Sequence, residues 1–163
     1  MRLYIAGPLF SPAHRAFHAE NVRRLREAGH DCFVPQEQEH NARQSRSVPR
    51  EVFRVDLEGV RWANALVALL DDPDVSSGTA CEMGIFYELA NHDPTKKGIL
   101  GILTDERPRR RDMGGAGERI NFFTLGCVEK RGQVYPSIDG VLEQLARWER
   151  ELAAAGLLKE PGP

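Results

Sequence analysis

The stretch Ala65-Leu66-Val67-Ala68-Leu69-Leu70 decides the fold, because it is the most apolar run in the chain. Six consecutive apolar residues without polar alternation are typical of a parallel strand that is buried on both faces. Such a strand needs helices on each side of its sheet. The run therefore predicts the central strand of an α/β sheet.

Strands and helices alternate along the rest of the chain. Short β-prone apolar runs predict strands, and apolar residues that recur every three or four positions predict helices. The expected strands cover residues 3–6, 32–34, 65–70 and 99–103. The expected helices cover residues 14–28, about 50–63 and about 78–91, with a final amphipathic helix marked by Val141, Leu142, Leu145 and Trp148. This alternation predicts a doubly wound, flavodoxin-like parallel sheet with helices on both faces.

Two longer segments show no periodicity. Residues 36–47 and 104–119 are polar or rich in glycine and charge, so both are expected to be loops. A chain of 163 residues fits a single domain. We expect that domain over residues 1–155 and a frayed tail over residues 156–163.

The charge balance limits the classes of partner. With 22 Lys and Arg against 24 Asp and Glu, the formal net charge is −2, so no overall positive field is available to bind a nucleic acid or an anionic membrane. No run is long enough to cross a membrane, and the first residues lack the features of a secretory signal. Three isolated cysteines suit a reducing compartment. We therefore expect a cytoplasmic protein that acts on a small molecule.

Ligands of doubly wound sheets bind beyond the carboxyl ends of the strands, so the loops after the first three strands are the candidate site. The third loop leads through Gly78 to Glu82, near the start of the expected helix. Backbone N–H groups and the helix dipole favour an ionised carboxylate there. An ionised carboxylate can act as a nucleophile, whereas the alternative interpretation is that Glu82 only caps the helix.

A second acid, Asp56, lies on the helix that leads into the central strand. Two neighbouring carboxyl groups raise the pKa of at least one of them, and such a pair serves as nucleophile and acid in glycosidic cleavage. The alternative is that Asp56 is a solvated acid on a helix surface. Spacing alone leaves both interpretations open.

Four short motifs occur in a recognisable order. They are Tyr4-Ile5-Ala6-Gly7-Pro8-Leu9-Phe10, Asp56-Leu57-x-Gly59-Val60, Ser77-Gly78-Thr79-x-x-Glu82-x-Gly84 and Ile120-Asn121. This arrangement, which spans nearly the whole chain, resembles the nucleoside 2-deoxyribosyltransferase family. The resemblance implies an enzyme that exchanges the base of a 2′-deoxynucleoside, with deoxynucleosides and free nucleobases as substrates and with no cofactor or metal.

The resemblance also implies roles for individual residues. Glu82 would attack C1′ of the deoxyribose and hold the sugar covalently until a second base takes it. Asp56 would position the sugar or handle the proton, and Tyr4 would support the Glu82 carboxylate. Asn121 would reach into a neighbouring subunit's site to bind the sugar hydroxyl, which implies a homo-oligomer.

Two loops depart from the family pattern. Many members place an Asp six residues before the nucleophile, where this chain has Ser76, so the proton donor is not identified. Related deoxynucleoside-monophosphate hydrolases recognise phosphate with a first loop rich in Gly, Ser and Arg. Here that loop contains Gly7, Pro8 and Phe10 and no Arg before Arg15, which favours an unphosphorylated nucleoside.

Base recognition is expected from Gln36 or Gln38, whose amides can pair with a base edge, although loop amides are equally often solvated. The complete expected substrate-binding set is Gly7, Pro8, Phe10, Gln36, Gln38, Ser76, Gly78 and Asn121. Two other features are expected to be structural. His14 and His18 are interpreted as exposed helix residues, and Cys81 as a small buried one.

Two alternative functions share the same candidate residues. One is a hydrolase that releases free sugar from a deoxynucleoside or its monophosphate. The other is a non-catalytic module that senses nucleosides or nucleotides, which the missing Asp at position 76 supports.

Overall fold

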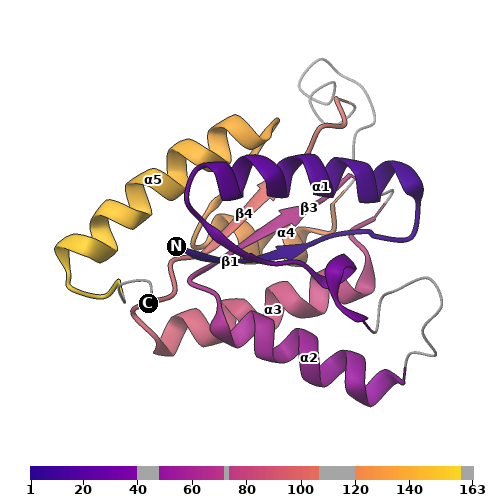
Figure 1. The fold of residues 1–163 in the computed structure, drawn as a ribbon, viewed down its shortest axis with the longest axis horizontal. Coiled ribbons are helices and arrows are strands. Elements are labelled where there is room, and N and C mark those ends of the chain that lie inside the picture. The colour runs from indigo at the N-terminus through magenta and orange to yellow at the C-terminus, as the bar shows by residue number, and fades with distance from the viewer. Residues whose placement is uncertain (40–47, 72–73, 107–119, 159–163) are drawn as a thin grey trace.

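The structure is a computed structural model that describes residues 1–39, 48–71, 74–106 and 120–158. Across these residues a five-stranded, all-parallel sheet has the strand order β2-β1-β3-β4-β5 (Figure 1). The strands are β1 (Arg2–Ala6), β2 (Asp31–Phe33), β3 (Ala65–Leu69), β4 (Ile99–Ile102) and β5 (Gln133–Tyr135). The helices are α1 (Pro12–Glu27), α2 (Pro49–Trp62), α3 (Ser77–His92), α4 (Phe122–Glu129) and α5 (Ile138–Ala154), with a 3-10 turn η1 (Pro35–Glu37).

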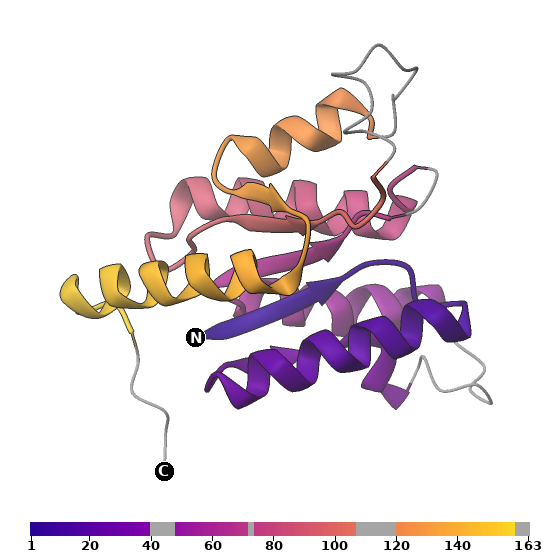
Figure 2. The same ribbon diagram turned by 90° about the horizontal axis from the view of Figure 1, so that it is seen from above.

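Helices cover both faces of the sheet. One face packs against α1 and α5, which lie side by side (Figure 2) and are joined by an ion pair between Arg24 and Asp139 at 2.5 Å. The opposite face packs against α2, α3 and α4. The sheet is therefore the middle of three layers, with one hydrophobic core on each side.

The central strands supply both cores. In β1, Leu3 and Ile5 belong to the core under α1 and α5, whereas Tyr4 and Ala6 belong to the core under α2 and α3. The run 65–70 alternates in the same way and is buried throughout. Side chains alternate between faces along a strand, so a strand covered on both faces must be apolar at every position.

The expected doubly wound α/β fold is confirmed, with the strand order of the flavodoxin type. The expected strands and helices all occur, with ends that differ by a few residues. The sequence analysis assigned no element to α4 or β5. The eight residues of α4 are too few to show a period, and β5 is a three-residue strand at the edge of the sheet.

Three expected irregular segments need comment. Pro35–Glu37 forms a 3-10 turn where only a loop was expected, while residues 40–47 and 107–119 lie outside the described residues. Leu157 and Leu158 pack against the core, and the Leu157 N–H donates to Leu152 O at 2.8 Å. The expected fraying therefore does not begin at Gly156, and residues 159–163 are outside the described part.

The order of the strands creates a crevice between β1 and β3. These strands are neighbours, but β1 continues into α1 on one face and β3 continues into α3 on the other. Connections that leave in opposite directions open a crevice at the carboxyl ends of the two strands. Among the described residues, no helix is both long enough and apolar enough to cross a membrane.

Candidate active site

Tyr4 and Glu82 meet across the core between the sheet and α3. The Tyr4 side chain is fully buried on the α3 side of β1, and its hydroxyl donates a hydrogen bond to Glu82 Oε1 at 2.7 Å. Glu82 is the sixth residue of α3 and is half-buried. The strand thus presents a fixed donor to a carboxylate on the facing helix.

Burial controls the charge of the Glu82 carboxyl group. Its pKa is raised to about 7: loss of solvent is the largest cause, the hydrogen bond from Tyr4 lowers the pKa, and the charge of Asp56 raises it. The sequence analysis expected the helix N-terminus to favour the ionised form, but desolvation dominates in the folded protein. Glu82 therefore changes charge near neutral pH.

The Tyr4 phenol stays protonated throughout the physiological range. Burial raises its pKa above the ordinary value near 10, and the negative charges of Glu82 and Asp56 raise it further. Because the phenol keeps its proton, Tyr4 acts as a donor to Glu82 and stabilises the ionised carboxylate.

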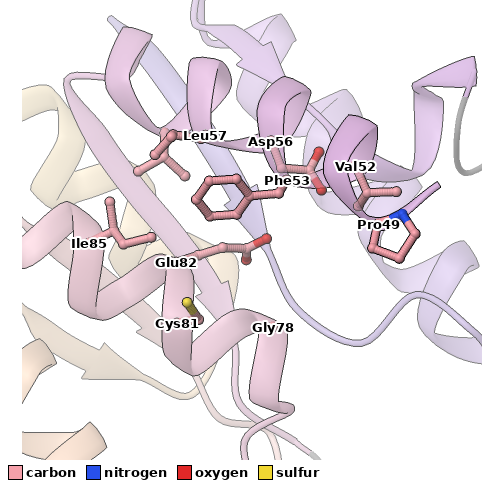
Figure 3. A pocket seen from close by; sticks show the side chains of 10 residues that line it. Pro49, Val52, Phe53, Asp56, Leu57, Gly78, Cys81, Glu82 and Ile85 are labelled. Carbon is pink, nitrogen blue, oxygen red and sulfur yellow. The ribbon is translucent and has the colours of Figure 1, made fainter. Parts of the chain in front are cut away.

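Asp56 and Glu82 face one groove from opposite sides. The groove lies between α2 and α3 and has a volume of about 380 Å³ (Figure 3). Its lining consists of Pro49, Val52, Phe53, Asp56, Leu57, Val60, Gly78, Cys81, Glu82 and Ile85. Among these residues, Asp56 and Glu82 are the two acids and none is basic. A mostly apolar cavity with a few polar groups is typical of small-molecule sites.

The start of α3 brings Gly78 to the rim of the groove. Ser76 is the N-cap: its hydroxyl accepts a hydrogen bond from the Thr79 N–H at 3.4 Å and is 2.9 Å from Thr79 Oγ1. A side chain at position 78 would meet open space. Of the predicted residues in this segment, Gly78 and Glu82 line the groove and Ser76 holds the helix end.

The loop after β1 lies outside the groove lining. Gly7 has φ +145°, and a Cβ there would lie 2.7 Å from the buried His18 ring, so only glycine fits this turn. His18 Nε2 is 3.1 Å from Pro8 O, and Phe10 is 91% exposed. The expectation that His18 is exposed was wrong, because its ring packs beneath the turn.

Gln36 and Gln38 form hydrogen bonds with the backbone in this structure. The Gln36 side chain donates to Arg15 O at 3.3 Å, and the Gln38 side chain donates to Val34 O at 3.2 Å. Arg15 in turn donates to Gln36 O at 3.3 Å and to Leu9 O at 3.4 Å. These contacts join the loops after β1 and β2, and neither amide lines the groove.

Asn121 is the N-cap of α4. Its side-chain oxygen accepts hydrogen bonds from the N–H groups of Phe123 at 2.9 Å and Thr124 at 3.4 Å. The residue is exposed and is absent from the groove lining. Within one chain, the structure therefore does not bring Asn121 together with Glu82.

The sequence analysis missed most of the apolar lining. Val52, Phe53 and Leu57 lie on the same face of α2 as Asp56, and Ile85 follows Glu82 by three residues on α3. Val52 and Phe53 lie four and three positions before Asp56, and Ile85 lies three after Glu82, so spacing along a helix face could have identified these three but not Leu57, which is next to Asp56. Cys81 also lines the groove and is exposed, so the expectation that it is buried was wrong.

Metal ligation has no candidate in the described part of the chain: it contains no group of three or more His, Cys, Asp or Glu residues that could hold an ion.

Comparison with solved structures places the chain among proteins of this fold. A conserved protein from Enterococcus faecalis V583 is 26% identical, with a TM-score of 0.72 over 90% of this chain and 98% of the other. The 2-deoxyribosyltransferase from Bacillus psychrosaccharolyticus is 22% identical, with a TM-score of 0.63 over 87% and 90% of the two chains. The 2-desoxiribosyltransferase from Leishmania mexicana is 20% identical, with a TM-score of 0.64 over 90% and 97%. A search of curated proteins found no match.

A family model gives the more specific result. Residues 3–134 match the model described as nucleoside 2-deoxyribosyltransferase. The match includes Asp56 and Glu82, which line the groove, and Tyr4, which donates a hydrogen bond to Glu82, and it extends over most of the chain. The chain therefore belongs to the nucleoside 2-deoxyribosyltransferase family.

Proposed function

We propose that this protein exchanges the base of a 2′-deoxyribonucleoside through a covalent deoxyribosyl intermediate on Glu82. The observation that carries the proposal is the Glu82 carboxylate, held by the Tyr4 hydroxyl at 2.7 Å beside an apolar groove. Membership of the family supports the same reaction class.

In the first half of the reaction, a Glu82 oxygen attacks C1′ of the deoxyribose. A C1′–O bond forms, the C1′–N bond breaks, and its electron pair stays on the base nitrogen. A proton then neutralises the base, which leaves. In the second half, a nitrogen of another base attacks C1′, releases the Glu82 carboxylate and loses its own proton, which balances the proton taken up by the first base. The two steps together need no oxidant, reductant or net proton.

Tyr4 and Asp56 have separate roles in this scheme. The Tyr4 hydroxyl positions the carboxylate and stabilises its charge before attack and after release. Asp56 faces the groove from α2, where it positions the sugar and passes a proton between water and the base. Such proton handling contributes roughly 10²- to 10⁴-fold to a rate.

The charge of the groove favours an unphosphorylated nucleoside. Among the residues that the structure describes, its lining contains two carboxyl groups and no Lys, Arg or His. A 5′-phosphate placed there would face the negative charge of these two carboxyl groups. The apolar surface of Val52, Phe53 and Leu57 offers a wall for a planar base.

The homo-oligomer remains part of the proposal. The resemblance to the family implies that Asn121, which lies outside the groove lining of its own chain, binds the sugar hydroxyl in a neighbouring subunit's groove. Such an exchange of residues suits a symmetric assembly, in which each subunit completes the other's site.

One incubation tests the reaction. The protein is given a deoxynucleoside and a different free base, and chromatography measures the new nucleoside, free base and free sugar. We expect a new nucleoside with the wild type and none with Glu82→Ala, which should keep its fold because the side chain borders a groove. Free sugar alone would indicate a hydrolase, and no turnover with measurable nucleoside binding would indicate a sensing module.

Mass spectrometry tests the intermediate directly. Brief exposure to a deoxynucleoside without an acceptor base should add a deoxyribosyl group to the peptide that contains Glu82. An adduct on another peptide, or transfer activity that survives Glu82→Ala, would overturn the assignment of the nucleophile.

A further inference from the structure

Phe33 lies directly against the tyrosine that binds Glu82. The rings of Tyr4 and Phe33 are stacked, with centroids 5.4 Å apart and planes inclined by 11°. The register of β1 and β2 pairs these two residues, so their side chains project from the same face of the sheet. The Phe33 ring therefore supports one face of the Tyr4 ring.

Gly59, on helix α2, also lies directly against the Phe33 ring. A Cβ at position 59 would be 2.6 to 2.7 Å from three ring carbons of Phe33, which is closer than any real contact. Gly59 is buried in α2, and its missing side chain allows the helix backbone to rest on the ring. Phe33 thus sets how closely α2 approaches the sheet.

The position of α2 matters because the same helix carries Asp56. Asp56 precedes Gly59 by three residues, about one helical turn, and Val60 after it lines the groove. A helix lifted at Gly59 would carry Asp56 away from the sheet. The thickness of one ring therefore sets the placement of Asp56, while its face restrains Tyr4.

We propose that Phe33 and Gly59 are positioning residues for transfer, with the Phe33 ring serving as a common spacer. The ring holds Tyr4 so that its hydroxyl reaches Glu82. It also sets the distance between the sheet and α2, which places Asp56 at the same groove. The inference rests on the proposed function of Glu82. It assigns a role to residues that do not line the groove themselves.

A packing role alone predicts a different response to substitution. Phe33 is half-buried in the edge strand β2, where an aliphatic side chain of similar size would fill much of the same space. A leucine has no flat face, so it cannot stack on Tyr4. The Phe33→Leu and Phe33→Tyr variants therefore separate the need for a ring from the need for apolar volume.

The first experiment compares these variants by their rates and pH dependence. We expect Phe33→Leu to lower kcat about 10- to 100-fold with little change in KM, since a small misplacement of reacting groups has effects of this size. The acid limb of its pH–rate profile, where the rate rises as Glu82 ionises, should move to higher pH, because a displaced Tyr4 hydroxyl stabilises ionised Glu82 less. Phe33→Tyr should remain within about threefold of the wild type, because it keeps the ring.

A matched control removes a half-buried aromatic ring from the other core. Phe17 lies on α1 and packs against the core under α1 and α5, on the opposite face of the sheet from Tyr4. Phe17→Leu should lower the thermal midpoint as Phe33→Leu does, but leave kcat and the acid limb unchanged. If the two variants behave alike in rate and pH dependence, the positioning role is overturned.

Gly59→Ala tests the helix contact. We expect kcat to fall by at least tenfold, because the new methyl group pushes α2 off the Phe33 ring. Adding Phe33→Leu should recover part of the lost stability, because the smaller side chain makes room for the methyl group. If Gly59→Ala does not fold, the comparison of Phe33→Leu with Phe33→Tyr still decides the proposal.

Carbon-13 NMR titration of the Glu82 carboxyl group separates failure of this inference from failure of the proposed function. The titration needs no turnover, and its midpoint should rise in Phe33→Leu and remain in place in Phe33→Tyr. An unchanged midpoint in Phe33→Leu would overturn the inference even in an active transferase. A shifted midpoint in a protein without transfer activity would reject the proposed reaction but would still support the role of Phe33 as a spacer.

Discussion

At the scale of single residues, the site depends on a carboxyl group whose charge is costly to bury. Glu82 has a pKa raised to about 7 by burial, and the Tyr4 hydroxyl partly offsets that effect. Nucleophilic attack needs the ionised form, whereas folding favours the protonated form. Activity and stability should therefore respond to pH in opposite directions.

The pH profile tests the two neighbours of Glu82. We expect kcat/KM for transfer to rise with pH through about 7 as Glu82 ionises. Tyr4→Phe should move this limb to higher pH, because it removes a hydrogen bond to the ionised carboxylate. Asp56→Asn should move it to lower pH, because it removes a neighbouring negative charge, and should also slow transfer. Shifts in the same direction would contradict these assignments.

The stability of Glu82→Gln should exceed that of the wild type at alkaline pH. The folded-state pKa of about 7 lies above the ordinary value of 4.5, so the folded state binds the proton more tightly and wild-type stability falls as pH rises between these values. The neutral amide avoids this loss, which should amount to about 1–3 kcal/mol above pH 7. Urea unfolding at pH 5 and pH 8 measures the difference. Equal effects at both pH values would reject the burial effect.

At the scale of elements, the groove is made by facing sides of two helices. On α2, the residues at three- and four-residue spacing around Asp56 form an apolar wall, and on α3 the first two turns carry Gly78 and Glu82. The sheet contributes the buried Tyr4. The helices therefore form the walls of the groove, and the strand supplies the hydrogen bond to Glu82, the proposed nucleophile.

Phe53 provides a test of the α2 wall. Its side chain is 57% exposed and lines the groove, so Phe53→Ala should leave the thermal midpoint nearly unchanged. Loss of a ring that packs against the base should raise KM for the deoxynucleoside roughly 3- to 10-fold, with a smaller effect on kcat. Trp62→Ala, at the other end of α2 and outside the groove, is the control. Equal KM changes in both variants would remove Phe53 from the site.

At the scale of the whole molecule, β1 and β3 are neighbours in the sheet although they are far apart in the sequence, and this arrangement brings distant segments together. Asp56 on α2 and Glu82 on α3 line one groove, and Tyr4 on β1 reaches Glu82 from the sheet. Asn121 remains outside that groove in one chain. The complete site therefore requires an assembly if Asn121 takes part.

Subunit mixing tests this assembly. The protein should elute as a dimer or larger on a sizing column. Glu82→Ala and Asn121→Ala should each be inactive alone, and their mixture should regain part of the activity under conditions that allow exchange. Mixed pairs contain one site with both residues intact. Absence of recovery despite demonstrated exchange would place Asn121 in its own subunit or outside the reaction, and a fully active monomer would reject the shared site.

The sequence by itself determined the α/β architecture and the nucleophile candidate. An uninterrupted apolar run at 65–70 favours the centre of a covered sheet, and four ordered motifs located Glu82 and Asp56. These features are local patterns or spacings along the chain, so they can be read without coordinates. The short α4 and β5 lack such patterns and were not assigned.

Only the tertiary structure decided the environment of the site. Whether Glu82 is ionised depends on how far α2, α3 and the sheet exclude water from it, and in the fold this desolvation outweighs the helix dipole. The stacking of Phe33 on Tyr4 and the contact of Gly59 with that ring join residues 29 and 26 positions apart. Such contacts arise where segments that are far apart in the sequence pack together, and spacing along the sequence does not specify them.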